Sequence, residues 1–584
     1  MKWGPDRWRL YGLALREAGR ALQGSLGPRR RFLGRPVRIL IAPQDLRTSD
    51  PTAAGEIYAG TFAFAGRAVS TGGRSPFAID PPTRAWGEAL YGFGWLRHLR
   101  AAETALARAN ARALVAEFAA RRPRHRALAR STPVLARRTL SFLAQSPLLL
   151  EGADHVFYQR FLRAIEQAAR ELAHAMRFAS QPRHRLAAAI ALCYAGLCCE
   201  GLERLLRHAT RVLARELDRQ ILPDGGHRSR NPQVVIELLL DLLPLRQTYA
   251  SRSLEPPSAL TGAIDRMLPI LRLLRHGDGA LARFNGMGAS AADELATLLM
   301  YEGARGRAMR RAPHAGYERL EAGETVLLAE VGPAPPVDDA AEAHAGCLSF
   351  ELSSGAQAIV VNCGAARSGA EETRLAARST AAHSTATVGE TSSGRLLSRQ
   401  GWLLERWIAA WLIRRLGHAV IRGPRVVPVE REERPREDGT QHLQASHDGY
   451  RALRITHARR WRLTSEGARL DGEDSFARAD AGAGEPATIR FHLAPGVRAS
   501  RVEGGAVLLV LPSREAWQFA AEGVDAGLEE SVFFAGSDGM RRTEQIVLNL
   551  DTAATPQVRW RFERLPRSPE RDESRHAEAL RPML

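Results

Sequence analysis

Apolar positions recur at helical spacing through about the first 310 residues of the chain, and strand-like alternation begins only after that point. The helical stretches are expected at Trp86–Ala120 (one long helix or two), Pro133–Gln145, Asp154–Ala179, Arg183–Gln220, Pro232–Ala250, Pro257–His276 and Ala289–Met300. Helices that follow one another across short Pro- and Gly-containing turns close into an α/α toroid or stack into a solenoid. No fixed sequence repeat is present, which weighs against a regular solenoid.

The second half of the chain has the pattern of an antiparallel β-sandwich. Strands are expected at Thr325–Val331, Cys347–Leu352, Ala358–Asn362, Ile489–Leu493, Ala506–Leu511 and Ser531–Phe534. The apolar stretch Leu403–Leu416 interrupts them as a helix or a long strand pair. The predicted organisation is a helical toroid over residues 1–315, a sandwich over 316–566 and a charged tail over 567–584.

Positive charge is concentrated in the helical half. The 584 residues carry a formal net charge of +18, and residues 1–310 hold 47 basic and 26 acidic residues, a net of +21. The remaining 35 basic and 38 acidic residues give −3. A basic half suggests a polyanionic partner such as nucleic acid, anionic lipid or acidic polysaccharide, although an arginine bias also arises from genome composition alone. Nucleic acid is disfavoured, because no known motif and no aromatic interleaving accompany the basic runs.

Several classes of protein are excluded by what the sequence lacks. Five cysteines without paired C-x2-C groups fit neither a disulfide scaffold nor a metal finger, and Cys193, Cys198 and Cys199 are expected to be buried thiols. The uncharged run Leu186–Cys199 is too short to span a bilayer, and charges interrupt the N-terminus where a signal peptide needs an apolar stretch. Phosphate-loop, nucleophile-elbow and zinc-protease motifs are missing, and Lys2 is the single lysine.

One candidate cluster precedes a predicted helix. In the segment DGGHRSRNP, Asn231 fits the helix cap and Pro232 the first helical position, so His227, Arg228 and Arg230 crowd an N-terminus that attracts anions. An ordinary capped loop with a surface histidine is the alternative. Asn285, in the RFNG turn between two later helices, is a further candidate for contact with a ligand.

Two more clusters fall in the sandwich. If Arg378–Val388 is a strand, His383 shares a polar face with Thr385 and Thr387 that points to solvent or lines a cleft. In SHDGY, an Asp-Gly turn presents His447 and Tyr450 on either side. Metal ligation by His447 and His457 is one interpretation, and histidines satisfied by backbone carbonyls are the other.

The order of five segments resembles the heparinase II/III family of polysaccharide lyases. These are DGGHRSRNPQ, then FNG, HAGCLSFELSSGAQAIVVNCG, RSTAAHSTATV and SHDGYRALRITHAR, and the resemblance extends over roughly residues 60–560. It implies an α/α toroid followed by an antiparallel β-sandwich. It also implies β-elimination at a uronic acid, for which no redox cofactor is required.

The resemblance implies particular roles for the candidate residues. His383 would act as base or as its partner, and His227 and Asn231 would offset the charge of the uronate carboxylate across one shared cleft. Tyr450 is the fourth catalytic candidate, and the substrate would contact Arg228, Arg230, Asn285, Arg378 and His447. The expected partner is an acidic polysaccharide such as a glycosaminoglycan.

The sequence also departs from the family pattern. Many members have a Tyr-His pair where this chain has Val234 and Val235, so the acid/base tyrosine falls to Tyr249, Tyr301 or Tyr450, or the role is lost. Some members hold a structural zinc, but no ligand set is evident here. The alternative to a lyase is therefore a non-catalytic glycan-binding or envelope-assembly protein on the same fold. The family implies the cell envelope or periplasm, whereas the absence of a visible signal peptide leaves the cytoplasm open.

Overall fold

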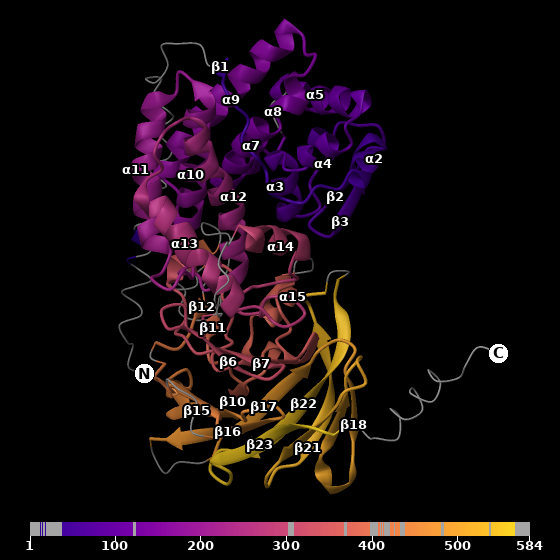
Figure 1. Cartoon of the computed structure of the whole chain (residues 1–584), viewed down its shortest axis with the longest axis vertical. Coiled ribbons are helices and arrows are strands. Elements are labelled where there is room, and N and C mark those ends of the chain that lie inside the picture. The colour runs from indigo at the N-terminus through magenta and orange to yellow at the C-terminus, as the bar shows by residue number, and fades with distance from the viewer. Residues whose placement is uncertain are drawn as a thin grey trace, which may run out of the picture.

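The computed structural model has a helical part followed by a two-sheet part, as Figure 1 shows from top to bottom. It describes residues 38–120, 124–301, 309–366, 371–396, 421–425, 427–432, 438–479, 484–536 and 539–566, with a few isolated positions elsewhere. The predicted fold class, an α/α toroid followed by an antiparallel β-sandwich, is confirmed. Most of Leu403–Leu416 and the whole tail 567–584 lie outside the described residues.

Helices dominate the described chain up to Met300. Their bounds are α2 Thr52–Tyr58, α3 Arg84–Gly92, α4 Leu96–Ala101, α5 Ala105–Ala120, α6 Arg126–Ala129, α7 Thr132–Ala144, α8 Ser146–Leu150, α9 His155–Arg177, α10 Pro182–Cys198, α11 Glu203–Gln220, α12 Pro232–Ser251, α13 Ser258–Leu273 and α14 Ala292–Met300. Helix α10 packs against α7, α9, α11 and α12, which explains why its sequence is apolar on nearly every side. The three clustered cysteines are buried there, as predicted.

Two predicted helical stretches are broken by local backbone geometry. The stretch Trp86–Ala120 forms three helices, because Phe93 and Glu103 adopt left-handed φ values of 56° and 52°. The stretch Arg183–Gln220 forms two, separated at Gly201 with φ 90°. At that break the two-residue strand β4 (Cys199–Glu200) pairs with β1 (Arg38–Ile39), a long-range contact that helical periodicity could not reveal.

The larger sheet has nine strands with the antiparallel order β21-β22-β17-β9-β8-β7-β6-β5, and β10 also pairs with β17. Its bounds are β5 Arg311–Ala312, β6 Tyr317–Ala322, β7 Thr325–Glu330, β8 Phe350–Ser354, β9 Gln357–Val361, β10 Ala386–Val388, β17 Pro486–Leu493, β21 Ala526–Phe533 and β22 Arg541–Asp551. The first strand of this sheet, β5, begins at Arg311, and residues 302–308 lie outside the described part of the chain. We propose that the boundary between the two domains lies near residue 315.

The smaller sheet has eight strands in the order β13-β14-β15-β16-β23-β20-β19-β18. Its bounds are β13 Val429–Arg431, β14 Gln441–His447, β15 Ile455–Leu463, β16 Arg469–Arg478, β18 Arg498–Arg501, β19 Val507–Val510, β20 Ala516–Ala521 and β23 Gln557–Arg564. Alternate residues of each sheet face the core between them, where Phe350 stacks on Trp560 at 5.5 Å between ring centroids. Strands β2 Thr61–Phe64 and β3 Arg67–Ser70 form a short hairpin, and the two-residue strands β11 Arg395–Leu396 and β12 Ile421–Arg422 pair antiparallel.

The segment Arg378–Val388 is not the continuous strand on which the shared polar face of His383, Thr385 and Thr387 depended. Helix α15 (Glu371–Ala377) and the 3-10 turn η3 (Thr380–Ala382) precede His383, and only the last three residues form β10. Thr380 Oγ1 donates to the Ala345 carbonyl at 2.7 Å and so holds this turn against the loop before β8. The predicted polar face is buried and does not point to solvent, because His383 and Thr385 are at most 1% exposed.

Buried charge fastens the toroid to the sandwich. Glu351 on β8 accepts hydrogen bonds from the backbone amide of Arg283 (3.1 Å) and from the side chains of Arg283 (3.3 Å) and His276 (3.1 Å), all from the helical part. Burial opposes ionisation, but Arg283 and the His276 hydrogen bond hold the pKa of the Glu351 carboxyl below its ordinary value. One carboxylate thus joins the two domains.

Candidate functional site

Polar side chains from both domains meet in a buried junction cluster, which we define as Asn231, Asn285, Tyr317, Glu330, His344 and His383. Asn285 connects several of them, because its amide donates to Glu330 at 2.6 Å and to the Tyr317 hydroxyl at 3.2 Å. Its side-chain oxygen accepts from the backbone amide of His344 at 3.4 Å. A Cβ placed at Gly286 would lie 3.1 Å from Asn231 Nδ2, so the cap of α12 lies beside the same turn.

His344 and His383 form a histidine pair within this cluster. His344 Nδ1 lies 3.0 Å from His383 Nε2, and His383 Nδ1 lies 2.7 Å from the Ser379 carbonyl oxygen. A carbonyl only accepts, so His383 carries its proton on Nδ1 and its Nε2 accepts from His344 Nδ1–H. The ring-nitrogen lone pair that these contacts leave unused in the two histidines is therefore the one on His344 Nε2. Burial lowers the pKa of His383 to about 4 and that of His344 well below its usual range, so both rings are neutral at pH 7.

Arg230 fills the space between the junction cluster and the start of the sandwich. Its guanidinium donates to the carbonyl oxygens of Ala315, Gly316, Gly332 and Pro333. It also pairs with Glu330 at 3.2 Å and lies over the Tyr317 ring at 5.3 Å. Only 6% of Arg230 is exposed, so this candidate for substrate contact is committed to the protein itself.

Glu330 has one oxygen without a hydrogen-bond partner. Oε1 accepts from Asn285, while the fully buried Oε2 has none. A Cβ at Gly346 would lie 2.8 Å from this oxygen and 2.7 Å from His383 Cδ2, so Glu330 and the histidine pair border the same small space. Burial raises the pKa of the Glu330 carboxyl. A bound water or a proton on Oε2 would lower the free-energy cost of leaving this buried oxygen without a hydrogen-bond partner.

Asn231 caps α12 as predicted. Its side-chain oxygen accepts from the Gln233 amide at 2.9 Å, and its Nδ2 donates to Glu342 at 2.7 Å. Glu342 in turn pairs with Arg183 at 3.1 Å. Both the oxygen and the nitrogen of the Asn231 side-chain amide are thus hydrogen-bonded, and the negative charge of Glu342 beside it is balanced by Arg183.

His227 does not contact the histidine pair. Its Nδ1 accepts from the Ser229 amide at 3.0 Å, and its Nε2 donates to Gln220 Oε1 at 3.2 Å, so both ring nitrogens are used within the toroid. Burial, reinforced by Arg183 and Arg228, lowers the pKa of His227 to about 3. A neutral, fully bonded ring of this kind orders the loop before α12.

The other predicted arginines are also committed to internal contacts. Arg228 lies 2.5 Å from Asp339 and 3.5 Å from Asp338. Arg378 donates to the Ala343 and Ala340 carbonyl oxygens at 2.8 and 3.1 Å. Their contacts hold the loop that leads to His344.

Tyr450 and His447 belong to a separate network in the sandwich. The Tyr450 hydroxyl donates to the Ala386 carbonyl, and Tyr450 is 1% exposed. His447 Nδ1 accepts from the Gly449 amide, its Nε2 donates to His457 Nδ1 at 3.3 Å, and His457 Nε2 donates to Asp474 at 2.6 Å. Neither of the other two tyrosine candidates reaches the junction cluster by its hydroxyl contact, since Tyr249 bonds Thr210 and Tyr301 bonds Gln247.

This network does not fit the structural zinc that some family members hold. All four ring nitrogens of His447 and His457 take part in the hydrogen-bonded relay, and the oxygens of Asp474 accept from Arg459, Trp560 and His457. Arg459 also places a fixed positive charge against Asp474, where a cation would have to bind. Within the part of the chain that is described, no group of three His, Cys, Asp or Glu is arranged to hold a metal ion.

Three members of the junction cluster were missed from the sequence. His344 lies in the HAGCLSFEL segment that carries the family resemblance, but a lone histidine in a loop gave no indication of its partner. Tyr317 and Glu330 lie at the start of β6 and the end of β7, which pair in the register Tyr317↔Glu330. Only that register, together with the RFNG turn from the toroid, brings them to Asn285.

The comparisons with known proteins agree with this architecture. Residues 304–561 match the family described as "Heparinase II/III-like, C-terminal". The chain is 31% identical over 562 residues to "FtsZ-localized protein C" of Caulobacter vibrioides, and the match covers 91% of each chain. The chain belongs to the heparinase II/III family.

Solved structures of this family share the fold at low sequence identity. A heparinase III crystal structure matches with a TM-score of 0.65 and 14% identity, over 85% of this chain and 80% of that one. Heparan sulfate lyase HepC from Pedobacter heparinus matches with a TM-score of 0.57 and 14% identity, over 95% and 88%. Among the described residues of this family member, no helix is long and apolar enough to cross a membrane.

Proposed function

We propose that this chain is a non-catalytic member of the heparinase II/III family that works by binding and localises with FtsZ. The observation that carries the proposal is the state of the junction cluster, where the cationic groups predicted to meet a substrate carboxylate are already bonded within the protein. Arg230 is bonded to four carbonyls and Glu330, Arg228 to Asp338 and Asp339, and Arg378 to two carbonyls.

Elimination at a uronic acid places specific demands on such a site. The enzyme must offset the negative charge that develops next to the carboxylate and must supply both a base and an acid. Here both ring nitrogens of His227 are hydrogen-bonded, and the family resemblance implies that the buried Val234 and Val235 of α12 stand where many members have a Tyr-His pair. These substitutions favour retention of the fold without the chemistry.

The assignment to FtsZ rests on the relative from Caulobacter, which is named for its localisation to FtsZ. Its similarity extends over 91% of both chains, so the toroid and the sandwich are both included in the match. A shared architecture over nearly the whole length supports a shared place of action, and we extend the localisation to this chain on that ground.

The test is co-localisation of a fluorescent fusion of the full chain with FtsZ in living cells. We expect coincident signals, loss of the focused signal on depletion of FtsZ, and no change with a His383→Ala variant that retains its fold. A diffuse signal in cells whose FtsZ is correctly assembled would contradict the proposal. A fluorescent protein alone is the control.

A second candidate function is a lyase that cleaves an acidic, uronic-acid-containing polysaccharide by β-elimination. The histidine pair favours it, because the lone pair on His344 Nε2 belongs to a neutral ring beside Asn285 and near the cap at Asn231. Elimination leaves a conjugated unsaturated uronate that absorbs ultraviolet light, whereas binding alone does not. A screen over heparan sulfate, hyaluronan, alginate and bacterial exopolysaccharides measures it directly. Absorbance that rises with wild type and is lost in His344→Ala would establish this function in place of the first.

A further inference from the structure

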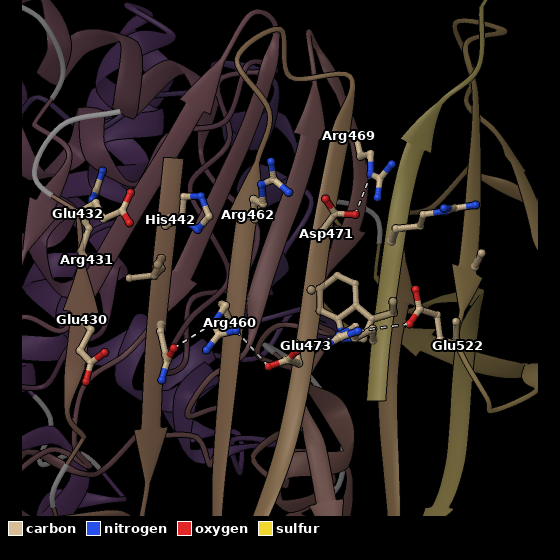
Figure 2. Close-up of a pocket in the computed structure, with 18 residues that line it drawn as sticks. Glu430, Arg431, Glu432, His442, Arg460, Arg462, Arg469, Asp471, Glu473 and Glu522 are labelled. Carbon is tan, nitrogen blue, oxygen red and sulfur yellow. Dashed lines mark hydrogen bonds and ion pairs between the residues drawn. The ribbon is translucent and has the colours of Figure 1, made fainter. Parts of the chain in front are cut away.

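A polar groove lies on the outer face of the smaller sheet, away from the junction cluster. It has a volume of about 1000 Å³ and crosses strands β13, β14, β15, β16, β23 and β20. Figure 2 shows charged side chains from these neighbouring strands pointing to the same side of the sheet. These outward side chains lie outside the sandwich core, which is supplied by the opposite face of the sheet.

The strand register arranges the charges in two rows across the groove. One row runs Gln444, Arg460, Glu473, Arg559 and the other His442, Arg462, Asp471, Arg561, in each case from β14 through β15 and β16 to β23. The two central carboxylates on β16 thus have an arginine on each side. Both carboxylates are recessed, with side chains 17% and 25% exposed for Glu473 and Asp471.

The two rows differ in how firmly their arginines are held. Arg460 and Arg559 both reach Glu473, at 3.3 and 3.1 Å. Arg462 lies 3.8 Å from Asp438 and Arg561 lies 3.8 Å from Glu563, distances too long for a hydrogen bond, and each side chain is 47% exposed. Arg462 and Arg561 therefore offer their guanidinium groups to an incoming carboxylate with little to displace.

The balance of charge limits the class of partner. The positive groups that line the groove with outward side chains are Arg460, Arg462, Arg469, Arg559 and Arg561, and the acidic ones are Glu430, Glu432, Asp471, Glu473 and Glu522. Arg431 also lines it but pairs with the buried Glu318. Five acidic side chains would repel a dense polyanion such as nucleic acid or a highly sulfated glycan, and five arginines would repel a polycation. A polypeptide segment that carries acidic and basic side chains can pair with the arginines and with the carboxylates of the groove.

We propose that this groove binds a mixed-charge, extended segment of a partner polypeptide, with two acidic side chains of the partner bound by Arg462 and Arg561. The inference rests on the proposed function, in which the chain acts by binding a protein partner. The glutamates at the two ends of the groove, Glu430 and Glu522, are placed to meet basic residues that flank the acidic pair.

Sheet geometry specifies the spacing of the partner's charges. Arg462 and Arg561 are on β15 and β23, two strand spacings apart, which is about 10 Å between backbones. A partner segment in the extended polyproline II conformation has three residues per turn and rises about 3.1 Å per residue, so residues three positions apart lie about 9 Å apart on the same face. The expected motif is therefore a pair of acidic residues three positions apart with basic residues on both sides. Bidentate contact with carboxylates is the geometry in which arginine is most effective.

The test measures binding of labelled synthetic peptides to the full chain by fluorescence anisotropy. The probe has two glutamates three positions apart between flanking arginines, and the comparison peptides are its all-Glu, all-Arg and scrambled counterparts. We expect the patterned peptide to bind at least about tenfold more tightly, because each exposed arginine–carboxylate pair contributes up to about fivefold in affinity and the patterned peptide makes two such pairs. Equal binding of the all-Glu peptide would overturn the proposal in favour of a simple anion site.

A charge-reversal cycle tests the residues. The double variant Arg462→Glu/Arg561→Glu is expected to lose the patterned peptide by about tenfold and to gain a peptide in which the two glutamates are lysines. The matched control is Arg498→Glu/Arg542→Glu, two exposed arginines on β18 and β22 outside the groove, which should leave binding unchanged. Equal melting temperatures of the two double variants establish that both are folded. Heparan or alginate oligosaccharides that compete with the patterned peptide at matched ionic strength would overturn the assignment to a polypeptide.

Failure of this inference is distinguishable from failure of the proposed function. If the groove variant localises with FtsZ and binds the peptides like wild type, the groove assignment is wrong and the localisation stands. If wild type does not localise with FtsZ but the charge-reversal cycle holds, the groove stands and the partner is another protein.

Discussion

His344 Nδ1 and His383 Nε2 lie 3.0 Å apart, and the second nitrogen of His383 is bonded to the Ser379 carbonyl. This contact ties the turn that precedes β10 to the loop that precedes β8. Because His383 is bonded at both nitrogens, the basic position of the pair belongs to His344. The residue that the family resemblance indicates thus acts as a support for a neighbour that the resemblance did not single out.

Substitution of His383 by alanine should destabilise the protein. It leaves the buried His344 Nδ1–H without its acceptor and opens a cavity, and the unmet donor alone costs about 1–3 kcal/mol of the free energy of unfolding. Urea denaturation of both proteins measures the difference. Thr456→Ala, at an exposed position of β15, is the control. An unchanged midpoint for His383→Ala would show that the contact is not formed in solution.

The stability of the protein should fall steeply in mild acid. The pKa of His227 is about 3 and that of His383 about 4 in the folded protein, while an unfolded histidine titrates near 6.5. Between these values the unfolded chain binds protons that the folded one does not, so stability is complete above about pH 6.5 and is lost as the pH falls towards 4. Thermal melts from pH 7.5 to 4.5 measure the slope. His227→Gln should reduce it by close to one proton, and an identical slope in that variant would contradict the assignment.

Removal of the Arg230 side chain should be among the most damaging single changes. Arg230→Ala strands the buried carboxylate of Glu330 and leaves four carbonyl oxygens without their donor. Breaking one side of a buried ion pair typically costs about 3–5 kcal/mol. Glu330→Gln, which keeps the hydrogen-bonding shape, should cost less. Chemical denaturation of the two variants side by side checks the order, and an equal or reversed order would count against a buried ion pair.

Glu351 should determine whether the two domains unfold together. Glu351→Ala removes the acceptor for Arg283 and His276 across the interface, and the loss of one partner of such a buried cluster typically costs about 3–5 kcal/mol. Differential scanning calorimetry should then show the toroid and the sandwich melting in two separate transitions. Glu324→Ala, on the turn between β6 and β7, serves as a control in the same domain. A single transition at the wild-type temperature would mean that other contacts hold the interface.

The outer face of α11 should account for much of the attraction to polyanions. Arg207, Arg211 and Arg215 are exposed at successive four-residue intervals, which places them along one face of the helix. Retention on a heparin column should fall steeply with salt, because exposed charges are screened within about 10 Å at 0.1 M. Substitution of all three by glutamine should move elution to clearly lower salt. Retention that does not depend on salt, or an elution position that the three substitutions do not change, would contradict a charge-driven surface.

The sequence by itself determined the order of the two domains and the identity of many elements. Helical periodicity, the Asn231–Pro232 start of α12 and the alternation around Phe350 are local signals, since each depends on residues within a few positions of one another. The breaks at Glu103 and Gly201 depend on a few residues adopting left-handed backbone, and the turn at Thr380 depends on hydrogen bonds to distant loops, among them the one to the Ala345 carbonyl. Such features leave no periodic pattern of apolar and polar residues in the sequence.

Only the tertiary structure decided which candidate residues meet. His227 and His383 come from equally suggestive motifs, yet the first is bonded to Gln220 and Ser229 while the second is bonded to His344. The meeting of Tyr317 with Glu330 depends on a strand register, and their contact with Asn285 depends on how the toroid docks on the larger sheet. Hydrogen-bond partners of buried groups are fixed by the packing of the whole chain, because each buried donor and acceptor must find a partner that sequence neighbours do not supply.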